Sequence, residues 1–251
     1  MSPGAGSFAQ PSGASSNAAI LLAAGRGLRM QERSADKVLE SIGGLPVICY
    51  SLNAFVKSGI AGRLLIVYRD EIQLSVLREA VGPSAVDPER IEWVRGGAER
   101  QDSVLHALRA LPSTVDLVFI HDCARPLIRS ATLLQLLELV KKHGAAALAH
   151  PVTDTIKQAQ PSSTVESPLL LTDLDRTTLW AMETPQAFRR TLITEAYARV
   201  QQEGLRVTDD TAALSTLDHP VSLLNPLYPN PKLTTPEDVL FVDFLLRHTT
   251  P

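Results

Sequence analysis

A glycine-rich turn with nearby basic side chains lies close to the N-terminus and has the composition of a polyphosphate-binding site. Gly25 and Gly27 allow the backbone to turn sharply and to approach a ligand closely. Arg26, Arg29 and Lys37 place positive charge beside main-chain N–H groups. Phosphate oxygens accept hydrogen bonds from both kinds of donor, so this segment predicts a phosphate-binding turn.

Other interpretations compete with this one. A dinucleotide fingerprint needs a third glycine that opens a helix, but this chain has Met30 there, which disfavours an NAD-dependent oxidoreductase. A P-loop would end in Gly-Lys followed by Ser or Thr, and the turn lacks that ending. Taken alone, the turn also fits an ordinary strand-to-loop connection with solvated arginines.

Three more segments carry residues suited to nucleotide chemistry. In HDCARP, Asp122 offers the oxygen ligands that Mg²⁺ prefers, and Arg125 can contact a second phosphate. In GGAERQDSV, Gly97 permits close approach of a flat ring, and Ser103 offers a hydroxyl group to its edge. Each has a plainer alternative, since Asp122 can cap the next element and Ser103 suits the first turn of a helix. Lys232, considered alone, is a surface lysine.

Alternating apolar runs and amphipathic segments predict the scaffold that positions these residues. Strands are expected at 20–22, 63–68, 91–95, 117–121, 145–150 and 221–225, and helices at 46–58, 71–81, 101–111, 130–142, 189–203 and 209–217. Such alternation is typical of an α/β fold, here a Rossmann-like, mostly parallel sheet with helices on both faces. Ligands bind such sheets at the carboxyl ends of the strands, so Gly25, Gly97 and Asp122 are expected to meet in one crevice.

Capping residues mark several helix boundaries. We expect Pro46 at the first helical position of its helix. Ser130 is expected as the N-cap of a helix that Gly144 ends. A last helix is expected to begin with Thr235 as its cap and Pro236 at its first position.

The stretch 152–178 breaks the alternation. Two β-prone runs flank a polar bend rich in proline and serine, which predicts a hairpin that leaves the sheet. An isolated hairpin is marginally stable in water, so we expect it to pack on another surface, such as a second subunit. A mobile surface loop is the alternative.

Composition narrows the class of protein. The net charge of −3 disfavours a broad nucleic-acid surface, and no apolar run approaches the ~18 residues of a membrane span. Two cysteines without metal-ligand spacing favour a reducing, cytoplasmic location. Residues 1–17 are rich in Ser, Gly, Ala and Pro and lack features of a secretory or transit peptide, so we expect a disordered tail.

In order along the chain, LAAGRGLRM…DK, GGAERQDSV, HDCARP, PVTDTIK, DLDRTTLWAMETPQAF, TDDTAAL and PKLTTPED resemble one family. It is the 2-C-methyl-D-erythritol 4-phosphate cytidylyltransferases of the non-mevalonate isoprenoid pathway. The resemblance implies a single nucleotidyltransferase domain over 18–251, with 152–178 as a dimerisation arm. It also implies a reaction in which CTP and methylerythritol phosphate give 4-diphosphocytidyl-2-C-methyl-D-erythritol and pyrophosphate, with Mg²⁺ as cofactor. The substrate phosphate would attack the α-phosphorus in line, without a covalent intermediate.

The resemblance also implies residue roles. Arg29, Lys37 and Lys232 match the family's catalytic cations, and Asp122 matches an acid that serves Mg²⁺. Thr155 and Arg176 match arm residues that contact substrate phosphate in the partner's site of a homodimer. The full set of implied substrate-binding residues is Ala23, Ala24, Gly25, Gly97, Ser103, Asp122, Arg125, Thr155 and Arg176.

Four positions depart from the family pattern. Leu22 and Asp36 stand where proline is usual, Cys123 replaces a small residue, and Pro231 replaces an apolar one. Asp36 also places an acid beside Lys37, so these departures bear on loop geometry and rate.

Two further alternatives share the nucleotide site. One is a pentitol phosphate cytidylyltransferase that makes CDP-ribitol, which the DLDRTTLW segment disfavours. The other is a non-catalytic nucleotide-binding regulator, which is disfavoured because the matched cations and Asp122 are all retained.

Overall fold

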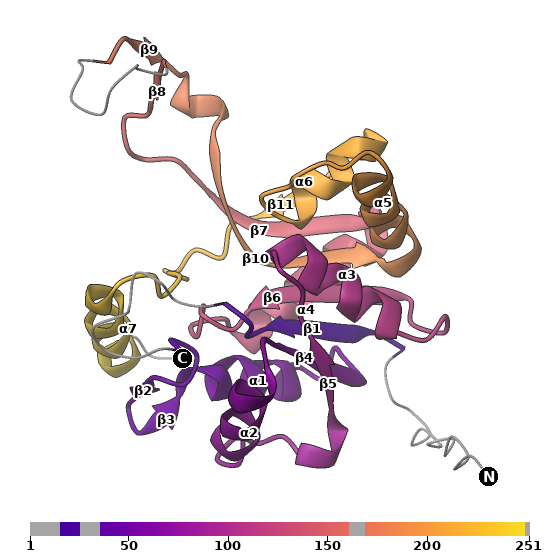
Figure 1. Cartoon of the computed structure of the whole chain (residues 1–251). Helices are drawn as coiled ribbons and strands as arrows, with labels where there is room; N and C mark the ends of the chain where they lie inside the picture. The colour runs from indigo at the N-terminus through magenta and orange to yellow at the C-terminus, as the bar shows by residue number, and fades with distance from the viewer. Residues whose placement is uncertain (1–15, 26–35, 161–168, 249–251) are drawn as a thin grey trace.

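A seven-stranded sheet in the order β11-β7-β10-β6-β1-β4-β5 forms the centre of the molecule (Figure 1). The computed structural model describes residues 16–25, 36–160 and 169–248. The predictions for the N-terminal tail before residue 16, and for Arg26, Gly27, Arg29 and Met30, lie outside the described residues. The strands of the sheet are β1 (Ala18–Leu22), β4 (Arg63–Tyr68), β5 (Ile91–Arg95), β6 (Leu117–Asp122), β7 (Ala145–Pro151), β10 (Trp180–Arg189) and β11 (Ser222–Leu224).

The sheet is mostly parallel, as the sequence predicts. β1 pairs in parallel with β4 and β6, β4 pairs in parallel with β5, and β11 pairs in parallel with β7. Only β10, which runs antiparallel between β6 and β7, departs from this pattern in the described sheet. β6 lies in the middle of the strand order, which agrees with its run of four apolar residues, Leu117 to Ile120.

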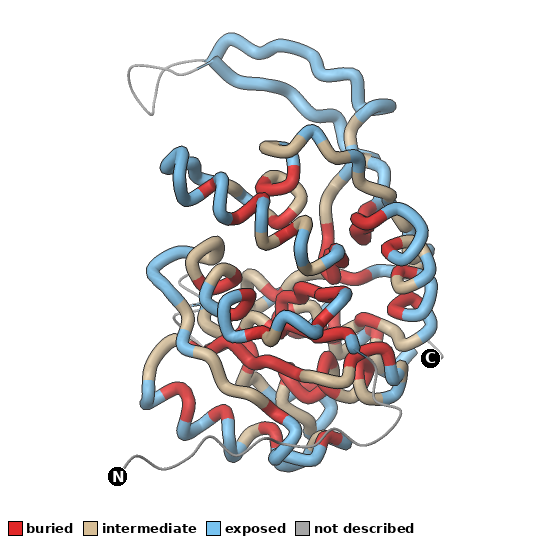
Figure 2. Tube along the Cα trace, turned by 90° about the vertical axis from the view of Figure 1, so that its right-hand side faces the viewer, coloured by how far each residue is buried: buried red, intermediate tan, exposed pale blue. Residues whose placement is uncertain are grey.

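Helices cover both faces of the sheet, and the strand side chains alternate between two cores. In β1, Ala18 and Ile20 pack into one core and Ala19 and Leu21 into the other, and all four are fully buried. The first core includes α3 (Arg100–Ala110), α5 (Arg190–Gln202) and α6 (Asp210–Leu214). The second core includes α1 (Val47–Ser58), α2 (Glu71–Ala80), α4 (Ser130–His143) and α7 (Pro236–His248). Figure 2 shows the buried residues concentrated in this layered body.

Most predicted boundaries are confirmed to within one or two residues, and two cap assignments are wrong. Pro46 ends a short strand and occupies the N-cap of α1, because its ψ of 139° lies outside the helical region. Ser130 is the first helical residue of α4, because the carbonyl of Arg129 already accepts a helical bond. Gly144 ends that helix in the left-handed region, as predicted.

Several elements were not predicted from the sequence. They are the strand β10, the hairpin of β2 (Ser41–Ile42) with β3 (Leu45–Pro46), and the 3₁₀ turn η2 (Pro88–Arg90). The helix expected at 209–217 is α6 followed by the 3₁₀ turn η4 (Ser215–Leu217). β10 escaped prediction because its middle residues are polar and include a proline, a composition that is rare in a central strand.

The predicted hairpin is present and projects from the body (Figure 1). From β7 the chain runs into β8 (Lys157–Ala159) and returns through β9 (Leu171–Asp173), which pairs antiparallel with β8. The 3₁₀ turn η3 (Arg176–Thr178) then leads back to β10. All residues of β8 and β9 are exposed, including Leu171. We refer to residues 152–178 as the arm, whose part in dimerisation stays a prediction. Over the described ranges, each helix is too short or too polar to span a bilayer.

Candidate active site

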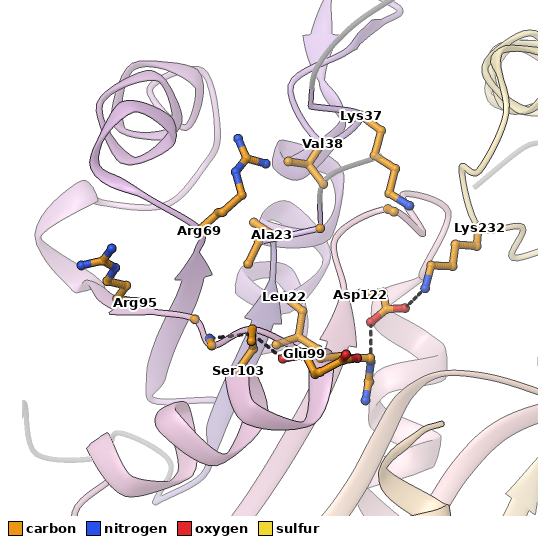
Figure 3. Close-up of a pocket in the computed structure, with 17 residues that line it drawn as sticks. Leu22, Ala23, Lys37, Val38, Arg69, Arg95, Glu99, Ser103, Asp122 and Lys232 are labelled. Atoms are coloured by element: carbon orange, nitrogen blue, oxygen red, sulfur yellow. Dashed lines mark hydrogen bonds and ion pairs between the residues drawn. The ribbon is translucent and has the colours of Figure 1, made fainter. Parts of the chain in front are cut away.

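A cavity of about 510 Å³ opens at the carboxyl ends of β1, β4, β5 and β6 (Figure 3). It is the crevice that the strand–helix alternation predicts, because strand ends distant in sequence meet there. Eight of the implied site residues line it, namely Ala23, Ala24, Gly25, Lys37, Gly97, Ser103, Asp122 and Lys232. Arg69, Arg95, Glu99 and Arg100 also line it and were not predicted from the sequence.

Backbone pairing that continues past the strands fixes the floor of the cavity. The N–H of Ala23 donates to the carbonyl of Val67 at 2.9 Å, and the N–H of Cys123 donates to the carbonyl of Leu22 at 3.1 Å. These bonds hold the turn after β1 against β4 and β6. The backbone at Ala23 and Ala24 therefore approaches the cavity in a fixed position.

The wall opposite this turn is the start of α3. A Cβ atom at Gly97 would collide with the side chain of Asp102, so close packing against the helix requires glycine there. The N–H of Gly97 donates to Ser103 Oγ at 3.1 Å, and Ser103 Oγ donates to the carbonyl of Glu99 at 3.2 Å. Glu99 and Asp102 form a capping box. The helix-start interpretation is therefore correct, and these residues also line the cavity.

Asp122 and Lys232 form the charged centre of the cavity. Lys232 Nζ lies 2.5 Å from Asp122 Oδ2, and Arg100 Nε lies 3.3 Å from Asp122 Oδ1. Burial raises the pKa of the Asp122 carboxyl, but the charges of Arg100, Lys232 and Arg125 outweigh it and hold that pKa below its usual range. Asp122 is therefore an anion at neutral pH.

Arg100 is a site residue that sequence reasoning missed. Its guanidinium group makes two bonds to Asp210, at 3.0 and 2.8 Å, in addition to its contact with Asp122. Asp210 is fully buried and also accepts a hydrogen bond from the hydroxyl of Tyr197 at 2.6 Å. Arg100 and Asp210 lie in two of the quoted motifs, but 110 residues separate them, and this pairing has no local signal.

Asp36 has a partner that the sequence did not indicate. Its carboxylate accepts two bonds from Arg69, at 2.8 and 3.0 Å, and one from Gln73 at 2.9 Å. The charge of Asp36, beside Lys37, is therefore compensated by the guanidinium group of Arg69, which follows β4.

Three implied site residues do not line this cavity. Arg125 donates to the carbonyl of Asn230 at 2.7 Å, so it ties the segment before Lys232 to the loop after β6. Thr155 and Arg176 lie on the exposed arm, where Arg176 donates to the carbonyl of Thr153 at 2.7 Å. Over the described residues, no group of three or more His, Cys, Asp or Glu side chains is placed to hold a metal.

Comparisons with known proteins point to a single family. A family model described as 2-C-methyl-D-erythritol 4-phosphate cytidylyltransferase matches residues 17–248. The enzyme of that name from Geobacillus kaustophilus is 38% identical over 91% of this chain and 96% of its own, and that from Bacillus velezensis is 36% identical over 91% and 94%.

Solved structures give the same result. The 4-diphosphocytidyl-2C-methyl-D-erythritol synthase of Anaerococcus prevotii superposes with a TM-score of 0.76 at 25% identity, covering 92% of this chain and 98% of its own. The 2-C-methyl-D-erythritol 4-phosphate cytidylyltransferase of Thermus thermophilus gives 0.69 at 26% identity, covering 91% and 98%. The chain therefore belongs to the IspD family of 2-C-methyl-D-erythritol 4-phosphate cytidylyltransferases, which are nucleotidyltransferases.

Proposed function

We propose that the cavity transfers the cytidylyl group of CTP to 2-C-methyl-D-erythritol 4-phosphate and releases pyrophosphate, a step of the non-mevalonate route to isoprenoid precursors. The observation that carries this proposal is the cavity itself, in which Lys232 and Arg100 pair with Asp122. Lys37 and two glycine-containing turns line the same cavity. A site that brings two phosphate-bearing substrates together needs cations more than it needs a base.

The cytosine ring is assigned to the side of the cavity between the two turns. Ala23, Ala24 and Gly25 form one edge there, and Gly97 and Ser103 form the other. Backbone groups can read the edge of a base where small residues allow close approach. The triphosphate then extends toward Lys37 and Lys232, whose segments lie across the cavity (Figure 3).

Transfer proceeds by in-line displacement at the α-phosphorus of CTP. An oxygen of the polyol phosphate forms the new P–O bond, the bond from the α-phosphorus to the bridging oxygen breaks, and pyrophosphate leaves with that electron pair. Lys37, Lys232 and Arg29 are assigned to the negative charge that develops on the transferring group and on pyrophosphate. No side chain becomes covalently modified.

Asp122 is the residue assigned to Mg²⁺. It is anionic and largely buried, and its carboxylate lines the cavity, which suits a hard cation that binds one or two carboxylates together with phosphates and water. When bound, Mg²⁺ supplies charge neutralisation at the triphosphate. Arg100 bonds both to the Asp122 carboxylate and to the buried Asp210, so it is held in place. Lys232 is therefore the cation that can leave Asp122 and bind a phosphate instead.

The arm is assigned to a homodimer in which Thr155 and Arg176 complete the partner's polyol phosphate site. Both residues are exposed and lie outside this chain's own cavity. Leu170 and Leu171 on the same arm are 72% and 60% exposed, so the arm carries apolar surface that a second subunit can cover. The two cysteines are buried free thiols, which suits a reducing cytoplasm.

Pyrophosphate release with CTP and a panel of polyol phosphates tests this function. We expect release with methylerythritol phosphate and little with ribitol 5-phosphate. Equal or faster release with ribitol 5-phosphate would support the pentitol alternative. Binding of CTP without release for any polyol phosphate would support the non-catalytic regulator. Chelation of divalent cations should abolish release if Mg²⁺ is required.

A further inference from the structure

A buried ion-pair cluster lies behind Lys37, made of Asp36, Arg69 and Gln73. Asp36 is 8% exposed and Gln73 is 2% exposed, so both are part of the protein interior. Arg69 binds both carboxylate oxygens of Asp36 through Nη1 and Nη2. Figure 3 shows Arg69 near Ala23 and Val38, while Lys37 extends toward Lys232 and Asp122. We name these three residues the Asp36 clamp.

Gln73 joins the clamp to the strand ends that form the cavity. Its amide nitrogen donates to the carbonyl of Ala23 at 3.0 Å and to Asp36 Oδ1 at 2.9 Å. Its amide oxygen accepts from the N–H of Arg69 at 2.6 Å. All three bonds are made inside the protein, where a lost partner is costly. The clamp therefore sets the distance between Ala23, at the end of β1, and the residue before Lys37.

Lys37 is held between two anchored neighbours. Asp36 is fixed by the clamp, and its carbonyl accepts from the N–H of Leu39 at 2.9 Å, which closes a turn around Lys37. Val38 is 3% exposed, and its carbonyl accepts from the N–H of Ile48 in the first turn of α1 at 2.9 Å. The backbone at Lys37 is thus fixed on both sides.

The guanidinium group of Arg69 is directed at protein carboxylates although it lines the cavity. Nη1 and Nη2 bind Asp36, and Nε binds Asp70 at 2.9 Å. The hydrogen bonds that Arg69 donates to Asp36 raise the pKa of Arg69 further above its usual range. With these three bonds made to carboxylates, the geometry of Arg69 is that of a residue that orders its surroundings.

We propose that the Asp36 clamp is a positioning device that places the ammonium group of Lys37 for its interaction with the triphosphate. This proposal rests on the proposed function in so far as Lys37 acts on CTP. Asp36, Arg69 and Gln73 act through Lys37. A displacement of about 1 Å in such a group costs about 10²-fold in rate, so the clamp affects kcat more than CTP binding.

A mutant cycle with Lys37 tests the proposal. Asp36→Ala and Arg69→Ala should each lower kcat by about 10–10²-fold, with KM for CTP changed less than about threefold. In a Lys37→Ala background, Asp36→Ala should add little, because the group that it positions is gone. Asp36→Asn, which can still accept from Gln73 and Arg69, should retain more activity than Asp36→Ala.

Arg63→Ala is the matched control. Arg63 lies at the opposite end of β4 and forms a single-bond, more exposed ion pair with Glu92 outside the cavity. Its removal should therefore leave kcat within about twofold. Near-wild-type kcat in Asp36→Ala would overturn the proposal. So would losses that multiply in the double variant, because they would mean that Asp36 acts independently of Lys37.

Hydrogen exchange distinguishes failure of the clamp from failure of the proposed function. The amide of Leu39, bonded to the carbonyl of Asp36, should exchange faster in Asp36→Ala and Arg69→Ala than in wild type or Arg63→Ala. This readout needs no substrate. If wild type turns over no substrate but exchange follows this pattern, the clamp exists and the proposed function fails. Unchanged exchange at Leu39 would overturn the clamp, whatever the activity.

Discussion

Removal of the Arg100 side chain should destabilise the protein strongly, because it strands a buried charge. Asp210 is fully buried, and Arg100 supplies two of its hydrogen bonds, at 2.8 and 3.0 Å. Breaking such a pair from one side costs about 3–5 kcal/mol. A domain of this size loses about 2–4 °C in Tm per kcal/mol, so Arg100→Ala should lower Tm by about 6–20 °C.

Urea unfolding followed by circular dichroism measures the loss of unfolding free energy in Arg100→Ala. Arg199→Ala, which removes an exposed pair with Glu203, should leave the midpoint unchanged within error. The triple variant Arg100→Leu/Asp210→Leu/Tyr197→Phe removes the charge together with both of its partners and should recover most of the loss. An Arg100→Ala protein whose unfolding free energy lies within about 1 kcal/mol of wild type would refute the reasoning.

Four further outcomes are expected. Lys37→Ala should lower kcat by about 10²–10³-fold with little change in KM for CTP, and steady-state kinetics with near-normal kcat would end that assignment. Asp122→Asn should impair turnover, and full activity in excess chelator would exclude the Mg²⁺ requirement. Arg176→Ala should raise KM for the polyol phosphate and not for CTP. A mixture of Arg176→Ala and Lys37→Ala subunits should regain activity, because one site of each heterodimer keeps both residues. Native mass spectrometry verifies that heterodimers form, and verified heterodimers without recovered activity would contradict the shared site. Burial lowers the pKa of His121 to about 4. In the unfolded chain this imidazole is protonated below about pH 6.5, whereas in the folded chain it stays neutral down to about pH 4. The free energy of unfolding should therefore fall as pH drops through that window, by at most about 3 kcal/mol, and urea titrations of a His121→Gln variant should lack this slope.

Local signals explain which parts of the fold could be predicted. The strands at 63–68 and 91–95 have the predicted bounds, because apolar runs between turns define them without help from the rest of the chain. β10 could not be predicted in this way. Its polar residues find partners elsewhere, since Glu183 contacts His150 and Asn230, and Gln186 contacts Asp209. Tertiary contacts of this kind override local composition.

The same distinction applies to the cavity. Gly25, Gly97 and Asp122 were found because each follows a predicted strand, and the fold class predicts that strand ends meet. The pairings of Arg100 with Asp210 and of Arg69 with Asp36 join residues that are distant in sequence, and only the folded chain reveals them. Arg125 was expected to face the cavity, yet its bond to the carbonyl of Asn230 directs it to the segment that carries Lys232.

The most direct test of the central claim is the ratio of kcat/KM for methylerythritol phosphate to that for ribitol 5-phosphate, measured by CTP-dependent pyrophosphate release. Wild type should favour methylerythritol phosphate by at least about tenfold, a difference of about 1.4 kcal/mol in transition-state binding. A Lys37→Ala preparation of equal stability should lose most release with either substrate. A ratio near or below one, or release that survives loss of Lys37, would contradict the assignment of cytidylyl transfer to this cavity.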